Sequence, residues 1–298
     1  MKKVFIIILN WNGWPDTLEC LSSLNNIIYD NFEIILIDNG SKEKLPISNY
    51  QFPKLTITQI FNDLNLGFAG GGNQGIKIAL EKNADYILLL NNDTAVEPDF
   101  LTKLIQVAQE NKEAGILGPM IYFYGQDKLI WSAGGKITHH FTRGELIGYN
   151  NIDNGQYKEI KEVDYISGTC LLVKKEVVEK IGLISEDYFL YYEDNDWCQL
   201  ARLAGFKCLL VPGAKIYHKA SRSAQEFSYP YIYYHSRNGL IFASRFGTKI
   251  STFLISLWIF LKQMVKLIIG YKKEWAKPVM KGVIDFWVGN KGKLEGYY

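Results

Sequence analysis

Short apolar runs alternate with amphipathic stretches up to residue 110, and this alternation limits the fold more than any other feature. Four runs have the length and composition of strands buried on both faces, at residues 4–9, 33–37, 55–61 and 86–90. Apolar residues at helical spacing lie between and after them, following Pro15-Asp16, over residues 73–82 and following Pro98. This pattern predicts an α/β, doubly wound fold, whose ligands bind at the carboxyl ends of the strands.

The chain is less regular from about residue 125 onward. Residues 132–164 contain Gly, Asn and His and predict a hairpin or a loop excursion. The pattern then predicts a strand, two helices that end at glycines, and a last strand: residues 166–173, 175–181 before Gly182, 195–204 before Gly205, and 207–211. Because no repeat or low-complexity linker divides the chain, we expect one continuous unit followed by a tail.

The composition is that of an ordinary globular protein with an uneven distribution of charge. Hydrophobic residues make up 48% of the chain and charged residues 21%, and the net charge of +2 argues against nucleic acid as a partner. From Lys249 to the C-terminus there are nine lysines, no arginine and three acidic residues. This basic tail predicts contact with an anionic surface, first of all the inner leaflet of a membrane.

Within the tail, residues 250–271 are mostly apolar, and three arrangements are open for them. An amphipathic helix that lies in the membrane interface is favoured. Packing onto the protein's own core is the second arrangement. A membrane span is the third, because a span needs roughly 20 predominantly apolar residues and Lys262 and Lys266 interrupt this stretch.

The N-terminal apolar run is too short for a signal peptide. It has six residues, stops at Asn10-Trp11-Asn12-Gly13 and has no small-residue cleavage site. We interpret it as a buried first strand and the protein as cytoplasmic. The four cysteines form no Cys-x-x-Cys pair, so no zinc or redox motif is visible.

Polar residues that follow strands are the first candidates for chemistry. Asp38 ends one strand and Asp93 follows another, so both are expected at the same edge of the sheet. Asp38 is suited to accept hydrogen bonds from a pyrimidine or a ribose, and Asp93 to bind a divalent cation on a diphosphate. His218, after the last strand, is a second candidate ligand. Turn formation, helix capping and an ordinary structural histidine are the alternatives for the three residues.

A glycine-rich segment, residues 67–75, precedes the helix expected from Asn73, where small residues let a phosphate approach a helix N-terminus. Gly70, Gly72 and Gly75 also match the Gly-x-Gly-x-x-Gly pattern of dinucleotide-binding oxidoreductases. That pattern requires a tight turn directly after a strand, usually the first one. Here residues 62–66 intervene and two β-α units precede it, so the oxidoreductase is the weaker alternative.

Three carboxylates, Glu193, Asp194 and Asp196, stand at the expected start of a helix, behind the aromatic residues Tyr191 and Tyr192. Capping and the helix dipole explain one acidic residue at such a position. Three of them, next to aromatic rings that can stack on a sugar, point to a general base.

Eight motifs in this order resemble family 2 glycosyltransferases, inverting enzymes that use nucleotide-diphospho-sugars, and most closely the rhamnosyltransferase-like branch that builds bacterial surface polysaccharides. The resemblance covers roughly residues 3–240. The motifs are Ile8-Leu9-Asn10-Trp11-Asn12, Ile37-Asp38-Asn39-Gly40-Ser41, Asn65-Leu66-Gly67-Phe68-Ala69-Gly70-Gly71-Gly72-Asn73, Leu90-Asn91-Asn92-Asp93, Ser167-Gly168-Thr169-Cys170, Tyr191-Tyr192-Glu193-Asp194-Asn195-Asp196, residues 212–218, and Tyr234-His235-Ser236-Arg237-Asn238.

The resemblance implies a GT-A-type, doubly wound nucleotide-sugar-binding fold with a mixed central sheet and a C-terminal amphipathic helical tail. Residues 1–248 would form the catalytic domain, with a nucleotide-binding half over 1–124 and an acceptor half over 125–248. Residues 249–298 would form the tail.

It also implies roles for single residues. Asp194 would be the general base, Glu193 its neighbour in the acceptor site, and Asp93 and His218 the ligands of Mg²⁺ or Mn²⁺. The donor would be held by Asn10, Asn12, Asp38, Asn65, Asn73, Asn91, Asn92 and Asp93. Candidates for contact with the acceptor or a phosphate are Trp131, Gly168, Thr169, Tyr192 and Arg237.

The chain departs from the family in its metal motif, which is often Asp-x-Asp, whereas Asn91 stands first here. It also lacks the Gln-x-x-Arg-Trp motif of the processive synthases, so we expect one sugar per encounter. The branch implies dTDP-L-rhamnose as donor, with a UDP-sugar next, and a saccharide or polyprenyl-linked acceptor. A catalytically silent nucleotide-sugar-binding protein is the further alternative, and a homodimer is left open.

Overall fold

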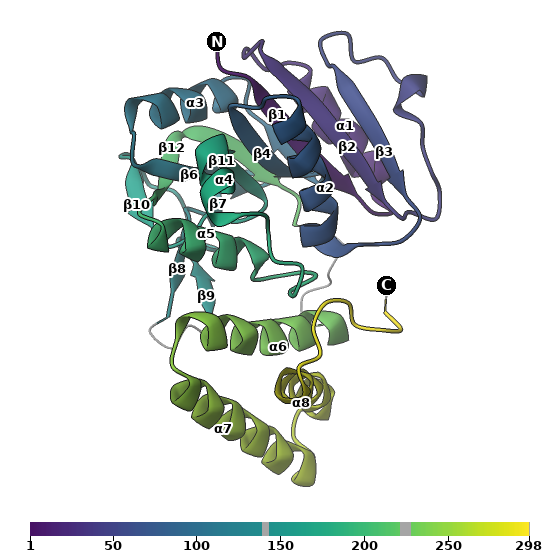
Figure 1. Cartoon of the computed structure of the whole chain (residues 1–298), viewed down its shortest axis with the longest axis vertical. Coiled ribbons are helices and arrows are strands. Elements are labelled where there is room, and N and C mark those ends of the chain that lie inside the picture. Colours follow the sequence, from purple (N-terminus) through teal and green to yellow (C-terminus); the bar gives the residue numbers. More distant parts are fainter. Residues whose placement is uncertain (139–142, 221–227, 298) are drawn as a thin grey trace.

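A computed structural model describes residues 1–138, 143–220 and 228–297 (Figure 1). The strands of the main sheet are β1 Val4–Asn10, β2 Phe32–Asn39, β3 Ile57–Asn62, β4 Tyr86–Asn91, β5 Thr94–Val96, β6 Ala114–Phe123, β7 Gln126–Ser132, β10 Lys161–Val163, β11 Cys170–Lys174 and β12 Lys207–His218. A separate hairpin pairs β8 Gly135–Ile137 with β9 Gly144–Leu146.

The main sheet is mixed, as predicted, and runs in the order β10, β12, β6, β11, β4, β1, β2, β3. Strands β4, β1, β2 and β3 are parallel to one another. Strand β11 is antiparallel to both of its neighbours, β4 and β6, while β12 is parallel to β6. The carboxyl ends of β1, β2 and β4 therefore lie at one edge of the sheet.

Helices cover both faces of the sheet (Figure 1). Helices α1 Trp14–Leu24 and α3 Phe100–Glu110 pack on one face, and α2 Gly67–Glu81, α4 Lys175–Ile181 and α5 Glu193–Leu203 on the other. Strand β1 shows how the sequence produces two cores, because Ile6 and Ile8 belong to the first core while Phe5 and Ile7 belong to the second. A 3₁₀ turn, Ile47–Asn49, precedes β3.

Helix α2 begins at Gly67, so the prediction of a glycine-rich segment before a helix at Asn73 is wrong. Its glycines bring the helix against β1 instead. A Cβ atom added to Gly71 would lie 2.7 Å from Leu9 Cδ2, and one added to Gly75 would lie 2.6 Å from Ile7 Cγ2. The glycines serve close packing of a helix on a sheet.

Strand β6 and its neighbour β7 were not predicted, because Gly115, Gly118 and Pro119 break the apolar run of β6. Beside Pro119, β12 has an irregularity between Val211 and Lys215 and then continues to His218, seven residues past the predicted end. The strand predicted from residue 166 begins only at Cys170, because residues 167–169 form a turn.

Three helices follow: α6 Tyr229–Phe246, α7 Lys249–Ile268 and α8 Lys273–Val288. In Figure 1 they lie beyond the lower edge of the sheet, with α6 nearest to it. Helix α8 packs on α6, where Tyr233 Oη donates to Asp285 Oδ2 at 2.7 Å, and on α7, where Trp287 Nε1 donates to Ser256 Oγ at 2.9 Å. Helix α6 was not predicted, α7 and α8 confirm the predicted C-terminal helical tail, and the predicted domain boundary at residue 248 stays a prediction.

We predict that Gly75→Ala destabilises the protein relative to Gly72→Ala. Both substitutions add a methyl group in the interior of α2 and gain the same helix propensity. Only the methyl at residue 75 meets β1, whereas the nearest atom to a Cβ at residue 72 is 3.7 Å away. The difference in the free energy of unfolding, measured by denaturant titration, is expected to be about 1–3 kcal/mol. Equal stabilities would contradict the packing of α2.

Candidate active site

The carboxyl ends of β1 and β2 place Asn10 beside Asp38 in register. Asn10 Nδ2 donates to Asp38 Oδ2 at 3.0 Å, and the other carboxylate oxygen accepts the backbone N–H of Ser41 at 2.8 Å. Both side chains are buried. Asn12 follows the end of β1, and its Oδ1 accepts the backbone N–H of Lys42 at 2.9 Å. The structure thus brings together three of the predicted donor-binding residues.

The end of β4 joins this group through Asn92. Asn92 Nδ2 donates to Thr17 Oγ1 at 2.9 Å, and Thr17 Oγ1 in turn donates to Asn10 Oδ1 at 3.0 Å. The side chain of Asn92 is therefore held against the N-terminal part of α1. Through Thr17 and Asn10, Asn92 is thus connected to Asp38. Asn91 and Asp93 are the neighbours of Asn92 in the chain.

Asn65 and Asn73 use their amides within the protein. Asn65 Oδ1 accepts the backbone N–H of Gly67 at 2.8 Å, which satisfies one free N–H at the start of α2. Asn73 Nδ2 donates to the carbonyl of Ile184 and to Glu186, both at 2.9 Å, and its Oδ1 accepts the N–H of Ile184. These contacts give Asn73 a positioning role between α2 and the segment after α4.

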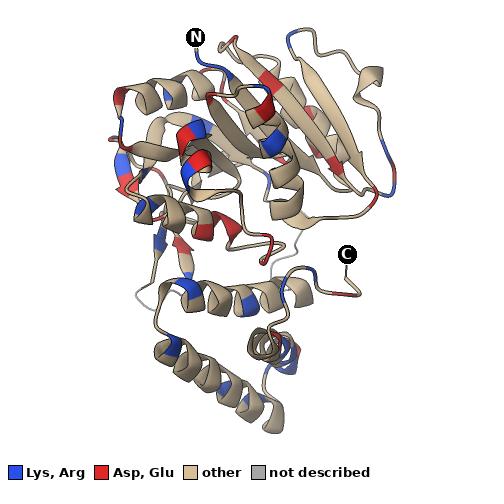
Figure 2. Cartoon of the chain, viewed as in Figure 1, with Lys and Arg blue, Asp and Glu red and all other residues tan. Residues whose placement is uncertain are grey.

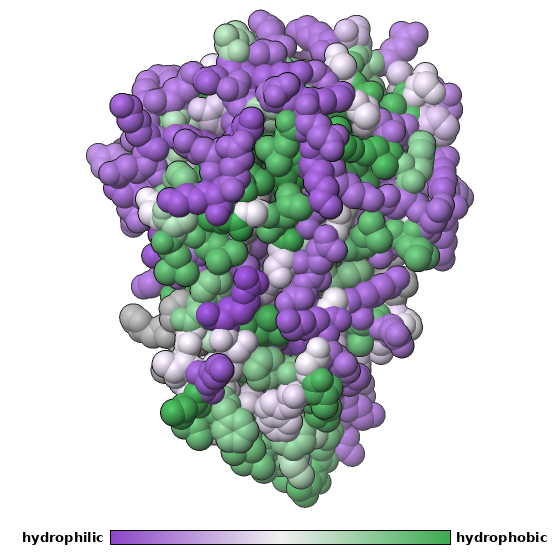
Figure 3. Space-filling view, in the orientation of Figure 1, coloured by the Kyte–Doolittle hydropathy of each residue, from purple (hydrophilic) through white to green (hydrophobic). Residues whose placement is uncertain are grey.

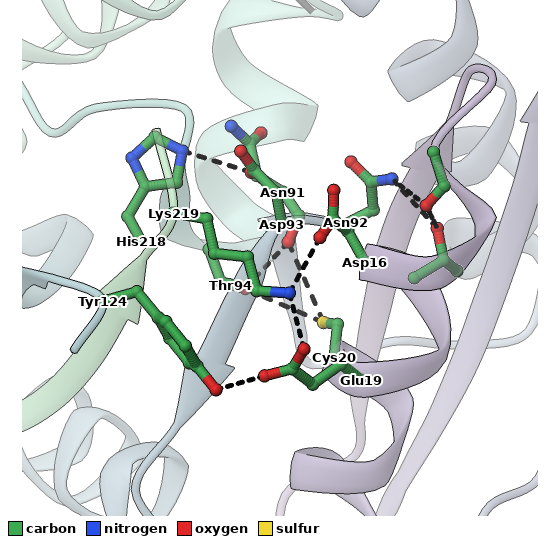
Figure 4. Close-up of polar contacts among 12 residues, drawn as sticks. Asp16, Glu19, Cys20, Asn91, Asn92, Asp93, Thr94, Tyr124, His218 and Lys219 are labelled. Carbon is green, nitrogen blue, oxygen red and sulfur yellow. Dashed lines mark hydrogen bonds and ion pairs between the residues drawn. The ribbon is translucent and has the colours of Figure 1, made fainter. Parts of the chain in front are cut away.

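Asp93 and His218 face each other, as predicted. Asp93 Oδ1 lies 3.1 Å from His218 Nε2, and both side chains are largely buried (Figure 4). Strand β12 brings His218 to this position by pairing it with Thr94 of β5. The ring of Trp131 packs edge-on against the imidazole at a centroid distance of 4.5 Å. Trp131, a predicted acceptor contact, thus touches the predicted metal ligand.

The Asp93–His218 pair fits a divalent cation that is shared with a diphosphate. Within residues 1–138, 143–220 and 228–297, no group of three or more His, Cys, Asp and Glu side chains is arranged to hold a metal by itself. One carboxylate and one imidazole suffice when phosphate and water oxygens supply the remaining ligands. The donor set is therefore compatible with a divalent cation that is bound together with a diphosphate.

Lys219 supports this pair and was not predicted. Its backbone N–H donates to the carbonyl of Asp93 at 3.0 Å, and its ammonium group contacts Asp16 at 2.7 Å and Glu19 at 2.6 Å (Figure 4). Tyr124 donates a further hydrogen bond to Glu19. Lys219, directly after His218, thereby ties α1 to the end of β12. Its place next to a candidate ligand was the only signal in the sequence.

The turn before β11 connects β4 to the start of α5. The carbonyl of Thr169 accepts the backbone N–H of Asn91 at 2.9 Å, and the backbone N–H of Gly168 donates to Asp194 Oδ2 at 2.8 Å. A Cβ atom at residue 168 would lie 3.6 Å from Asp194 Cβ and 3.2 Å from the ring of Phe68. Gly168 and Thr169 therefore link the predicted base to the end of β4.

The two adjacent carboxyl groups of α5 have unusual environments. Burial raises the pKa of Glu193 well above its usual range, and the neighbouring Asp194 carboxylate raises it further. Burial also raises the pKa of Asp194, against the lowering effect of the backbone N–H groups of Gly168 and Asn195. Glu193 Oε2 is buried without a hydrogen-bond partner among the described residues. Glu193 is thus favoured in its neutral form beside Asp194.

Asp196, the third carboxylate, has a structural role. Its Oδ1 lies 2.8 Å from Arg245 Nη1 of α6 and accepts a hydrogen bond from Tyr188 Oη at 2.8 Å. Burial raises the pKa of Asp196 to about 6. The prediction of a general base from three carboxylates therefore now depends on Glu193 and Asp194, and Asp196 does not support it.

The backbone before α5 is strained. Phe189, Tyr191 and Tyr192 have φ angles of 64°, 67° and 76°, a left-handed conformation that costs of order 1–3 kcal/mol per residue where the side chain is not glycine. The ring of Tyr192, a predicted acceptor contact, is buried 5.9 Å from the rings of His235 and Phe242. Such strain persists only where surrounding contacts hold it, and it is common at active sites.

Asn238 and Arg237 of α6 supply those contacts. Asn238 Nδ2 lies within 2.8–3.0 Å of the carbonyl oxygens of Tyr188, Leu190 and Tyr191, and Arg237 Nη2 donates to the carbonyl of Tyr188 at 3.1 Å. Arg237 is buried, and its other nitrogens contact Tyr233 Oη and Asn238 Oδ1. We therefore correct the prediction that Arg237 contacts acceptor or phosphate, because its guanidinium group supports the strained segment.

Comparison with known proteins decides the family. Residues 5–182 match the family model described as Glycosyl transferase family 2. The chain is a family 2 glycosyltransferase. The motif resemblance is confirmed, and the dinucleotide-dependent oxidoreductase is wrong, since Gly70, Gly72 and Gly75 lie inside α2.

Two relatives cover most of this glycosyltransferase. It is 24% identical over 305 residues to the low-salt glycan biosynthesis hexosyltransferase Agl10 of Haloferax volcanii, covering 99% of this chain and 94% of the relative. It is 24% identical over 257 residues to the N-acetylglucosaminyl-diphospho-decaprenol L-rhamnosyltransferase of Mycobacterium tuberculosis, covering 80% and 82%.

A solved structure shares the fold. The mannosyltransferase PcManGT from Pyrobaculum calidifontis, in complex with GDP-Man and Mn²⁺, superposes with a TM-score of 0.55 at 13% identity. The superposition covers 97% of this glycosyltransferase and 86% of that chain. The GT-A-type fold with a mixed sheet is therefore confirmed.

We predict that Asn238→Ala lowers turnover of the glycosyltransferase by up to roughly 100-fold, because a displaced start of α5 misplaces its carboxylates. The KM for the donor should change little, since the Asn238 side chain is bonded to the segment before α5 and to Arg237 and not to the ends of β1, β2 or β4 in the described structure. Steady-state kinetics with varied donor measure both quantities. Asn111→Ala is the control, because it also removes an amide-to-backbone bond, at the end of α3. Equal losses of turnover in both variants would contradict the positioning role.

Proposed function

We propose that this enzyme is an inverting, metal-dependent, non-processive glycosyltransferase that moves one sugar from a nucleotide diphosphate to a saccharide or polyprenyl-linked acceptor. The proposed donor is dTDP-L-rhamnose, followed by a UDP-sugar. The motif resemblance and the name of the mycobacterial relative, an L-rhamnosyltransferase, support this choice. The observation that carries the proposal is the path of contacts from Asp194 through Gly168 and Thr169 to the end of β4.

In this mechanism the end of β2 holds the nucleotide. The carboxylate of Asp38 is oriented by Asn10 and Ser41 and can accept hydrogen bonds from the base or the ribose. Asn12 and Asn92 complete the same edge of the sheet. The diphosphate extends from there toward Asp93 and His218.

Asp194 acts as the general base. Each of its carboxylate oxygens accepts one backbone N–H, from Gly168 or Asn195, and retains a lone pair for the acceptor hydroxyl. As the acceptor oxygen bonds to the anomeric carbon, its proton passes to Asp194. The bond between that carbon and the diphosphate oxygen breaks on the opposite face, so a single displacement inverts the anomeric configuration. The raised pKa makes Asp194 a stronger base than an ordinary aspartate.

Two further features of the chain support the reaction. A divalent cation bound by Asp93 and His218 would neutralise charge on the departing nucleotide diphosphate. Glu193, favoured in its neutral form, avoids a second negative charge next to Asp194 and can donate a hydrogen bond to the acceptor. A polyprenyl-linked acceptor would place the enzyme at the cytoplasmic face of a membrane.

We predict that Asp194→Asn keeps donor binding and lowers transfer by roughly 10²- to 10⁴-fold. In the wild type, the transfer rate should rise with pH through the raised pKa of Asp194 and then level off, because only the ionised carboxylate accepts a proton. Single-turnover transfer and calorimetric binding of the donor separate the two effects. Near-wild-type transfer by Asp194→Asn would remove this residue from the base role.

We predict that Asp93→Ala abolishes the stimulation of transfer by added Mn²⁺, because it removes the carboxylate ligand of the pair. Titration of activity with Mn²⁺ after chelation tests this outcome. Asp99→Ala is the matched control, since Asp99 is a partly exposed carboxylate that forms an ion pair with Lys103 in the described structure. Unchanged metal stimulation in Asp93→Ala would contradict the assignment.

A further inference from the structure

Helix α7 has its polar face turned inward. Its buried side chains are Thr252, Ser256 and Gln263, which share one side of the helix. Ser256 accepts a hydrogen bond from Trp287 of α8. The helix therefore docks on the rest of the protein through these polar groups and the ring of Phe260, while most of its large apolar residues do not pack onto the protein's own core.

The outward side of α7 is an apolar stripe along the whole helix. Its members are more than one-third exposed and recur at helical spacing: Ile250, Phe253, Leu254, Trp258, Leu261, Met264, Val265 and Ile268. Ile250 and Ile268, at the two ends, are 75% and 79% exposed. In Figure 3 this region forms the hydrophobic lower end of the molecule. A continuous apolar surface of this kind marks an interaction site.

Positive charge and aromatic rings accompany the stripe. Helix α7 carries lysines and no acidic residue (Figure 2). By helical spacing Lys262 borders one side of the stripe, and Lys266, one turn further along the same flank, lies nearer the inward face. The ammonium group of Lys262 lies 4.7 Å from the ring centroid of Trp258, and Lys272 lies over the rings of Tyr271 and Trp275. Tryptophan, tyrosine and lysine are the residues that occupy the boundary between lipid headgroups and hydrocarbon.

We propose that the outward face of α7, residues 249–268, docks on the surface of an anionic lipid bilayer. The stripe would enter the boundary between headgroups and acyl chains, while the bordering lysines contact anionic headgroups. Docking itself does not depend on the chemistry of the enzyme. Its purpose, to present the active site to a polyprenyl-linked acceptor, rests on the function proposed above.

A bilayer fits this face better than a second copy of the chain. In a symmetric pair of α7 helices, the lysines beside one stripe would meet a partner helix that has no acidic residue to pair with them. An anionic membrane instead attracts the same lysines. Charge complementarity therefore selects lipid as the partner.

Among the described residues, α7 alone is long and apolar enough by length and composition to cross a membrane. Its contacts with α8 favour a position along the surface. Phe260 and Trp287 pack with ring centroids 5.1 Å apart, in addition to the bond from Trp287 to Ser256. A span would have to break these contacts and bury Lys262 and Lys266 in hydrocarbon, which is costly.

Docking in this way turns the carboxyl edge of the sheet toward the membrane. Helix α6 lies between that edge and α7 (Figure 1). Through Asn238, α6 contacts the strained segment that leads to Asp194, and through Tyr233 it contacts α8. The membrane-facing helices and the proposed base are thus joined by one path of direct contacts.

Vesicle flotation tests the proposal with the full chain. The wild type should float with vesicles of phosphatidylcholine mixed with phosphatidylglycerol, and less with phosphatidylcholine alone. Lys262→Gln combined with Lys266→Gln should weaken partitioning to the mixed vesicles by roughly 30-fold, since each lysine near an anionic surface contributes about 1 kcal/mol. Leu254→Glu combined with Leu261→Glu should abolish flotation. The matched control is Ile152→Glu combined with Leu203→Glu, which charges two exposed apolar residues elsewhere.

The outcomes separate docking from chemistry. Flotation of Leu254→Glu/Leu261→Glu at the wild-type level would overturn the proposal. A wild-type dimer in sedimentation that these two substitutions dissociate, without flotation of the wild type, would also overturn it and assign the face to a second copy. Extraction of the wild type from vesicles only by detergent, and not by high salt or alkaline carbonate, would indicate a span and overturn it as well. If the wild type floats but transfers no sugar, docking stands and the proposed function fails.

Discussion

The hydrogen bond from the backbone N–H of Gly168 to Asp194 joins the two halves of the site. On one side of it, the carbonyl of Thr169 is bonded to Asn91 at the end of β4. On the other, the start of α5 follows three left-handed residues, and Asn238 holds this segment through the carbonyl groups of Tyr188, Leu190 and Tyr191. The position of Asp194 is therefore set by contacts from β4, from the turn before β11 and from α6, none of them adjacent in sequence.

Much of the fold was predictable, because the period of the apolar residues reports burial directly. Strands β1 to β4 and helices α1, α3 and α4 were found where the pattern predicts them, to within two residues where ends were given. Helix α2 began earlier because its glycines are packing residues, which sequence alone does not distinguish from a phosphate loop. Strand β6 was missed because its neighbours in the sheet accommodate Gly118 and Pro119, and that depends on tertiary structure.

The candidate site residues that lie at the ends of strands were predictable from the sequence. Asn10, Asp38 and Asp93 follow strands whose direction is shared, and His218 pairs with Asp93 as expected. Arg237 and Asp196 were misread, because an arginine motif and an acidic cluster carry no sign of their partners in the fold, Tyr188 and Arg245. Lys219 was missed for the same reason, since its partners Asp16 and Glu19 lie about two hundred residues away in the chain. The sequence showed the apolar character of the tail, but its outward direction follows only from how α7 packs on α8.

The most direct test of the central claim is a crystal structure of the protein with dTDP and Mn²⁺, in which anomalous scattering locates the metal. We expect a manganese peak in contact with Asp93 Oδ1 and His218 Nε2, with the diphosphate bound to it and the base beside Asp38. Asp194 should then stand open to the space beyond the diphosphate. A nucleotide bound away from the ends of β1, β2 and β4, or a metal with no contact to Asp93, would contradict it.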